Sequence, residues 1–178
     1  MAELRDPYTA AHERRGAALA RDIGVELGMS SDDVEGLHVM GLVHDIGKVT
    51  VPVEILSYPG RLNSAQFALV QHHSQYGYDL LRSIRLPWPV ADVVLQHHER
   101  LDGSGYPLGL RGDAICRQAR ILAVADVVEA MSSHRPYRAA LAVDVALAEL
   151  QKNAHVLYDR DVVVACVALF RQHGYAFE

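Results

Sequence analysis

The sequence has few cysteines, no long hydrophobic run and no leader-like N-terminus. Only Cys116 and Cys166 are present, so no disulfide framework can form, and we expect two free thiols. The longest apolar run, residues 162–170, is nine residues long, whereas a membrane-spanning helix needs about 18. The first six residues already include charged side chains and lack the apolar segment of an export signal. We therefore expect a soluble, cytoplasmic protein.

Positively charged residues are fewer than negatively charged ones. Seventeen Lys and Arg residues against 22 Asp and Glu residues give a net charge of −5 at pH 7. This sign is wrong for a protein that holds a nucleic acid polymer on a broad basic face. An anionic ligand must therefore be met locally, by a few cationic side chains or by a metal. What the chain does have is ten histidines, against a single tryptophan.

Helix start and stop residues predict an all-α protein with one domain over residues 1–178 and about seven helices. No period-2 strand, internal repeat or Pro/Gly/Ser linker interrupts the pattern. The expected helices run from Pro7 to just before Gly28, from Ser30 or Ser31 to no further than Gly47, from Asn63–Ser64 to Ile84, from Pro89 to His97, and over about residues 114–132, 142–154 and 159–172. A loop at residues 99–112 holds four glycines.

Helical register places two histidines on faces that should be buried. His44 lies three residues after Gly41 on the inward face of the second helix, where an ionisable group needs a partner. His73 shares a predicted buried face of the third helix with Leu80, seven residues later. The neighbouring His72 falls outside that face, so we predict that it lies on the surface.

Three further polar residues stand in apolar surroundings. His97 and His98 both continue the face that begins at Val90 in the fourth helix. Asp126 interrupts the apolar run at residues 121–128, where an unpaired carboxylate would cost much free energy. Both histidines can therefore point inward, and Asp126 needs a partner that neutralises it.

One hypothesis accounts for all of these residues: they converge from five helices on metal. The seven candidate ligands are His12, His44, Asp45, His73, His97, His98 and Asp126. Imidazole and carboxylate donors without thiolate suit iron, manganese, zinc or similar ions, and a bridging Asp45 would favour two ions. The alternative, a hydrogen-bonded core or cap residue, explains any one of these side chains better than it explains the whole set.

Four blocks of sequence carry a family resemblance. They are DPYTAAH at residues 6–12, HDIGK at 44–48, HHERLDGSGYP at 97–107, and Ala125-Asp126 followed by RPYR at 135–138. Together they resemble the HD-GYP family, a branch of the HD-domain phosphohydrolases, over essentially the whole chain. The resemblance implies an HD-type helical bundle with a metal site in its core. It also implies hydrolysis of cyclic di-GMP, a bacterial second messenger, to linear pGpG or on to GMP.

The same resemblance implies cofactors and residue roles. The cofactors would be two divalent transition metal ions, iron or manganese ahead of zinc, nickel or cobalt. One ion would be held by His12, His44, Asp45 and Asp126, and the other by Asp45, His73, His97 and His98. Asp45 and Lys48 would be catalytic, and Lys48, Arg135 and Arg138 would bind substrate phosphate. The pocket would be shaped by Asp102, Gly103, Gly105, Tyr106 and Pro107.

The chain departs from the family pattern at two places. Tyr8 stands where some members carry a Glu that supports a third metal, so we expect two metals. Tyr58-Pro59-Gly60 replaces a Lys-Pro-Gly turn that many relatives have, which removes one cation near the exit of the second helix.

Two other functions remain open at this point. The first is an HD-type phosphohydrolase that acts on another cyclic dinucleotide or on a nucleotide. The second is a catalytically silent module that binds cyclic di-GMP or another protein, against which the intact ligand set and Lys48 argue. Family members usually carry a receiver or sensory domain upstream. No regulatory domain is visible in this sequence, so either that portion has been removed or the protein acts alone or with a separate signalling partner.

Overall fold

The computed structural model describes residues 7–133 and 141–177, with side chains from residue 11 onward. These residues form nine α-helices and two short 3₁₀ helices, with two isolated bridges and no β-strand. The elements are α1 Pro7–Glu26, α2 Ser31–Val43, η2 Ile46–Thr50, α3 Val53–Leu56, α4 Ser64–Gln71, α5 His73–Leu81, α6 Val90–Gln96, η3 Gly112–Ala114, α7 Arg117–Ser132, α8 Val143–Lys152 and α9 Arg160–Arg171. The predicted all-α class is confirmed.

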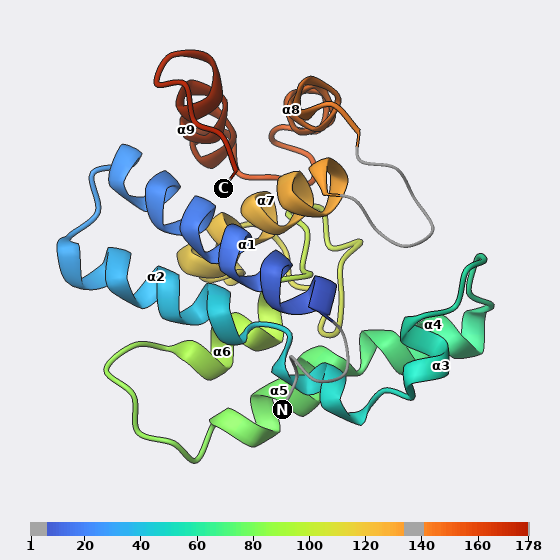
Figure 1. Ribbon diagram of the computed structural model, residues 1–178. Coiled ribbons are helices and arrows are strands. Elements are labelled where there is room, and N and C mark those ends of the chain that lie inside the picture. The colour runs from blue at the N-terminus through green and yellow to red at the C-terminus, as the bar shows by residue number, and fades with distance from the viewer. Residues whose placement is uncertain (1–6, 134–140, 178) are drawn as a thin grey trace.

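Helix α7 lies at the centre of the bundle (Figure 1). Helices α1 and α2 form a hairpin that packs on one side of α7, and α8 and α9 cover another side. Eight of the sixteen residues of α7 are buried, as expected for a helix with neighbours all round. Helices α5 and α6 close the lower part of the bundle, while α3 and α4 form an arm at its side (Figure 1).

Several helix boundaries follow from local capping. Gly28 has a φ of +67°, the left-handed conformation that lets the chain leave α1. The side chain of Ser30 accepts a hydrogen bond from the amide of Asp33 and so begins α2. Asn63 and Gln66 form a capping box that begins α4. These starts and stops confirm the predictions at the same residues.

The predicted third helix is wrong in one respect, because it is two helices. The chain turns at His72, which ends α4 and precedes α5, so a single helical period does not run through both segments. Leu80 is therefore 48% exposed, although the periodicity predicted that it shares a buried face with His73. His72 itself is exposed, as predicted, and Leu81 is buried in place of Leu80.

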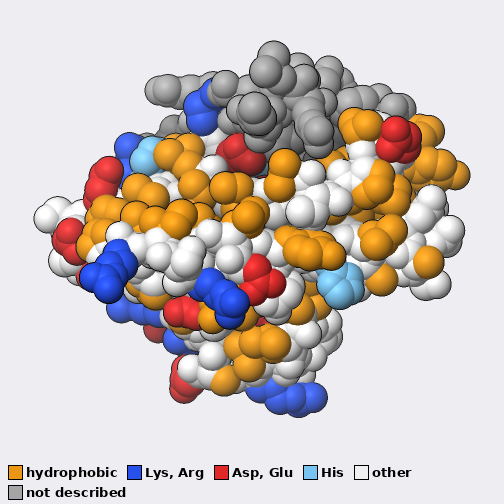
Figure 2. Space-filling view, turned by 90° about the horizontal axis from the view of Figure 1, so that it is seen from below, with side chains coloured by type: hydrophobic (Ala, Val, Ile, Leu, Met, Phe, Trp, Pro, Cys, Tyr) orange, Lys and Arg blue, Asp and Glu red, His pale blue; other side chains and the backbone are white. Residues whose placement is uncertain are grey.

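The second helix also ends earlier than its predicted limit, at Val43, and the HDIGK block continues as η2. The short helix α3 was not predicted, so the helix count exceeds the expected one. Hydrophobic side chains, Val53, Leu56 and Leu69 among them, gather on the surface over the arm of α3 and α4 (Figure 2).

The core is a single cluster of aliphatic side chains. Its largest buried members include Leu19, Ile23, Leu37, Met40, Ile121, Leu122, Leu147 and Leu150. Both thiols are free as predicted, but only Cys166 is fully buried, because Cys116 lies at the start of α7 where it is partly exposed. Among the described helices, none is long and apolar enough to cross a bilayer.

Close backbone packing brings η2 against α5. A Cβ atom added at Gly47 would lie 2.6 Å from the nitrogen of Gly77 and would overlap the carbonyl oxygen of His73. Only glycine therefore fits at this contact. The contact matters for function because it joins the HDIGK block to the helix that begins at His73.

We expect Gly47→Ala to lower the free energy of unfolding by about 1–3 kcal/mol or more, because the added methyl group must push two backbone segments apart. Gly16→Ala in α1 is the matched control. No atom lies within 4 Å of the Cβ that it would add, and replacing a glycine inside a helix should stabilise by about 0.5–1 kcal/mol. Urea unfolding of both variants gives the measurement. Equal stabilities would contradict the packing argument.

Candidate metal centre

The seven predicted metal ligands come together in the structure. Among the described residues they form two groups, each with ligand atoms within 4.8 Å of one another. The His12 group consists of His12, His44 and Asp126, and the His73 group consists of Asp45, His73, His97 and His98. Helices α1 and α7 contribute ligands from within their length. The other ligands lie at the end of α2, the start of α5 and the end of α6.

Asp45 belongs to the His73 group but also lies beside the His12 group. One of its carboxylate oxygens, Oδ1, is 3.3 Å from Nε2 of His73 and 4.0 Å from Nε2 of His97. The other oxygen, Oδ2, is 3.5 Å from Nε2 of His44 and 4.0 Å from Nε2 of His12. The side chain is almost fully buried. Asp45 is therefore placed to offer one oxygen to each group, which is the geometry of a bridging ligand.

Backbone carbonyls orient three of the imidazoles. The Nδ1–H groups of His44, His73 and His97 each donate to the carbonyl three residues earlier, at 2.7, 2.5 and 2.7 Å. When such a ring is neutral this is its only N–H, and Nε2 then carries a lone pair that faces the neighbouring ligand atoms. The Nε2 atoms of His73 and His97 lie only 3.3 Å apart.

Two buried atoms in this centre have no hydrogen-bond partner among the described residues, namely Nε2 of His44 and Oδ1 of Asp45. Unpaired lone pairs that face one another in a buried site are unfavourable unless a cation lies between them. The donor set contains imidazole and carboxylate and no thiolate, as divalent transition metals accept. The residues present therefore fit a divalent metal site.

The His12 group is ion-paired. Burial alone would lower the pKa of His12, but hydrogen bonds to Asp126 and Glu129 raise it to about 10. Burial would likewise raise the pKa of Asp126, but the hydrogen bond from His12 and the nearby His44, whose Nε2 lies 3.8 Å from Oδ1 of Asp126, hold it well below its usual value. Nε2 of His12 lies 3.1 Å from Oδ1 of Asp126. Protons therefore occupy this group when no other cation does.

The His73 group has the opposite character. Burial lowers the pKa of His98 to about 3 and lowers the pKa of His97 well below its ordinary value. These imidazoles are neutral, with lone pairs available at neutral pH. Burial would raise the pKa of Asp45, but the positive charges of Lys48 and His44 hold it well below the usual range.

Lys48 lies at the edge of the centre. Its ammonium forms an ion pair with Oδ2 of Asp45, three residues earlier. The Lys48 side chain is partly exposed, whereas that of Asp45 is buried. The ammonium therefore lies between the buried carboxylate and the solvent.

The glycine-rich loop packs directly on the centre. The ring of Tyr106 lies over the ring of His98, with centroids 4.7 Å apart and planes inclined by 32°. The ring centroid of Phe67 in α4 lies 6.4 Å from that of Tyr106, edge to face. A Cβ atom at Gly105 would lie 2.5 Å from the carbonyl oxygen of His98, so only glycine allows this approach. Tyr106 therefore forms one wall of the centre.

Two carboxylates shape the same loop. Asp102 accepts hydrogen bonds from the amide and the hydroxyl of Ser104, at 2.9 and 2.6 Å, beside Gly103 with its φ of +80°. Buried Glu99 accepts from the amides of Leu108 and Leu110, at 2.7 and 3.0 Å. Pro107 is exposed at the loop surface. Sequence reasoning placed Glu99 inside a motif but did not predict its positioning role, which only the folded loop shows.

A family model described as an HD domain matches residues 1–162. The chain belongs to the HD domain family. Among curated proteins it is 39% identical over 163 residues to 3′3′-cGAMP-specific phosphodiesterase 3 of Vibrio cholerae, a match that covers 92% of this chain and 35% of that protein. It is 40% identical over 159 residues to the cyclic di-GMP phosphodiesterase response regulator RpfG of Xanthomonas campestris. This match covers 88% of this chain and 42% of that protein. It is 36% identical over 174 residues to a cyclic di-GMP phosphodiesterase of Thermotoga maritima, a match that covers 97% of this chain and 47% of that protein.

Solved structures agree with this assignment. The HD-domain chain superposes with a TM-score of 0.75 on Bd1817, an HDG"Y"P protein from Bdellovibrio bacteriovorus, over 90% of this chain and 51% of that chain; at 17% identity this match shows the fold alone. It superposes with a TM-score of 0.62 on a cyclic GMP-AMP-specific phosphodiesterase of V. cholerae, at 32% identity over 98% of this chain and 40% of that chain. The resemblance inferred from the sequence blocks is confirmed. The chain spans less than half the length of the three curated relatives named above.

Some predicted site residues of this HD domain are not placed. Arg135 and Arg138 lie outside the described residues, and so does the side chain of Tyr8. Tyr58 is exposed in the turn between α3 and α4. Sequence reasoning also missed Glu129, a buried carboxylate that hydrogen-bonds His12. Its position three residues after Asp126, on the same side of α7, was the available signal.

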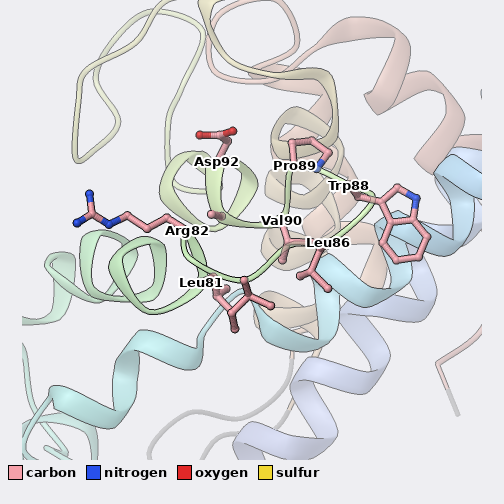
Figure 3. A pocket seen from close by; sticks show the side chains of 9 residues that line it. Leu81, Arg82, Leu86, Trp88, Pro89, Val90 and Asp92 are labelled. Carbon is pink, nitrogen blue, oxygen red and sulfur yellow. The ribbon is translucent and has the colours of Figure 1, made fainter.

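A separate cavity of about 170 Å³ lies where α5 ends and α6 begins. Figure 3 shows Arg82 and Trp88 extending to opposite sides of it, with Leu81, Leu86 and Val90 nearby. Its lining contains no histidine and no member of either ligand group. The imidazole-rich cluster that fits a divalent metal is therefore separate from this cavity.

Divalent metal binding to the His12 group should release protons. With a pKa of about 10, His12 is protonated near neutral pH in the metal-free protein, and a metal must replace the proton on Nε2. Apparent affinity should therefore rise with pH across about pH 6 to 9. Calorimetric titration with Mn(II) in two buffers of different ionisation enthalpy measures the release. Heats that do not depend on the buffer would contradict the prediction.

Proposed function

We propose that this HD domain is a metal-dependent phosphodiesterase that hydrolyses cyclic di-GMP to linear pGpG, with GMP as a further product. The single observation that carries the proposal is the position of Asp45, which offers one buried oxygen to each of two ligand groups. The named activities of the relatives supply the substrate class.

We assign two cations to these groups. The first would be held by the His12 group with Asp45, and the second by the His73 group, which includes Asp45. Nitrogen and oxygen donors without sulfur favour iron or manganese, with zinc, nickel and cobalt as alternatives. When bound, such ions supply Lewis acidity, which lowers the pKa of a water molecule and offsets the charge of a phosphodiester.

Lys48 would act on the substrate phosphate. Its ammonium has three N–H donors, and one of them is directed to Asp45. Another donor can therefore reach a phosphate oxygen or protonate the leaving oxygen as the ester bond breaks. The partly exposed position of Lys48 is compatible with a ligand that arrives from solvent. Asp45 in turn orients Lys48 through their ion pair.

The aromatic wall would bind a base of the substrate. Cyclic dinucleotides present two flat bases, and bases stack on aromatic side chains with a gain of about 1–3 kcal/mol each. Tyr106 lies over His98 beside the metal ligands, and the exposed Phe67 extends this wall. Burial raises the pKa of Tyr106, so its phenol is neutral. We therefore assign Tyr106 the role of a stacking surface and not that of a proton acceptor.

A second substrate has specific support. A V. cholerae relative at 39% identity and the V. cholerae structure at 32% identity both carry names that specify cyclic GMP-AMP. The two cyclic dinucleotides share the phosphodiester and differ in one base, so the metal ligands do not discriminate between them. We also propose that the domain acts in the cytoplasm and takes its input from a regulatory domain or signalling partner, since one relative is named as a response regulator.

Replacing Asp45 with Asn should reduce the turnover of cyclic di-GMP by more than about 100-fold and lower metal content, because a neutral amide is a poor bridging ligand. Purified protein loaded with Mn(II) would be assayed on cyclic di-GMP and on 3′3′-cGAMP, with products separated by chromatography. His72→Ala is the matched control, since His72 is exposed and outside both ligand groups. Full activity in Asp45→Asn would refute the proposed centre. Loss of activity in His72→Ala would show that the wrong member of the histidine pair was chosen.

Arg135→Ala and Arg138→Ala should each raise KM for cyclic di-GMP by about tenfold or more, because a guanidinium–phosphate pair is charge-assisted. Metal content should not change, since these residues are proposed to contact the ligand and not the ions. Steady-state kinetics and elemental analysis on the same samples separate the two effects. A loss of metal with unchanged KM would assign these arginines a structural role.

A further inference from the structure

Glu129 is a fully buried carboxylate that belongs to neither ligand group. It lies on α7, three residues after Asp126. Its Oε2 accepts a hydrogen bond from Nδ1–H of His12. Its Oε1 accepts from Nε and Nη2 of Arg15, at 2.8 and 2.6 Å, and from the hydroxyl of Ser133 at 2.5 Å. Each oxygen of Glu129 therefore has a partner.

This arrangement distinguishes His12 from three other histidines of the centre. His44, His73 and His97 direct Nδ1–H to a backbone carbonyl, whereas His12 directs it to a carboxylate. A charged acceptor on one ring nitrogen increases the basicity of the other nitrogen and holds the ring in place. Unlike these three, His12 is a candidate ligand whose strength depends on a second side chain.

Arg15 makes the buried charge of Glu129 tolerable. A carboxylate taken out of water without a cation would cost several kcal/mol. Arg15 supplies two hydrogen bonds and one positive charge, and it also donates to the hydroxyl of Ser133 at 3.0 Å. Because Arg15 lies three residues after His12 on α1, the same helix presents both the ligand and the group that stabilises its partner.

We propose that Glu129, held by Arg15, is a positioning residue that sets the metal affinity of the His12 group separately from that of the His73 group. The inference rests on the proposed metal centre. It goes further by stating that the two cation positions depend on different supports, one on a charged pair and the other on backbone carbonyls. Within the described part of the chain, Glu129 hydrogen-bonds to His12, Arg15 and Ser133 and to no member of the His73 group.

The test is Glu129→Gln, which keeps the shape of the side chain and removes its charge. Equilibrium dialysis with Mn(II) counts the sites and their affinities, and electron paramagnetic resonance distinguishes coupled Mn(II) pairs from isolated Mn(II). We expect one site to weaken by about 10–100-fold while the other keeps its affinity. The spectrum at limiting Mn(II) should then change from that of a coupled pair to that of an isolated ion.

Asp159→Asn is the matched control. Asp159 pairs with Arg120 of α7 at 2.9 Å and lies outside both ligand groups. The substitution therefore also turns an arginine-paired carboxylate into an amide, but away from the ligands. Both Mn(II) sites should keep their affinity in this variant. If Glu129→Gln does not fold, Arg15→Lys keeps the positive charge but loses the two-point contact, and it should weaken the same single site to a lesser degree.

Three outcomes have distinct meanings. Two sites unchanged in Glu129→Gln, or two sites weakened equally, would overturn the inference while leaving the metal centre in place. Weakening of the sites in Asp159→Asn as well would reduce the role of Glu129 to general stability and would also overturn it. An unaltered protein that binds no Mn(II), iron or zinc would refute the proposed function itself.

Discussion

The structure depends on burying one carboxylate, Asp45, among imidazoles that approach it from two sides. A buried carboxylate needs compensation, which Lys48 supplies to one oxygen. Nε2 atoms of His73 and His97 lie near one oxygen and those of His44 and His12 near the other, so a bound cation would supply the rest. To satisfy this single side chain, α1, α2, α5 and α6 must all reach the same point beside α7. The packing of the bundle can therefore be understood as the arrangement that brings these helices to Asp45.

Helix ends make this convergence possible. His44 follows α2, His73 begins α5 and His97 follows α6, so each of these ligands sits where the backbone changes direction. At such positions a carbonyl three residues earlier is available to accept the Nδ1–H of the ring. The side chain is then directed by the backbone itself. Glycine at position 47 allows η2 to approach α5 closely enough for these ends to meet.

The two ligand groups differ electrostatically although they share a carboxylate. An ion pair between His12 and Asp126 holds the His12 group together, whereas His97 and His98 of the His73 group are neutral imidazoles. Lys48 lies on one side of this arrangement and the pair of Arg15 and Glu129 on another. A centre of this kind contains one region where protons compete with metal and one region where they do not.

The sequence by itself determined the helical class, most helix starts and the set of candidate ligands that the fold brings together, because capping residues and polar side chains in apolar surroundings are local signals. It did not determine that α4 and α5 are separate, since the chain turns at His72 without a proline or glycine and the apolar pattern continues through the turn. Only the tertiary structure decided that Asp45 presents one oxygen to each ligand group and that Glu129 supports His12. Both facts depend on distances between residues as far apart in sequence as α1 and α7, and such distances are set by packing and not by local pattern.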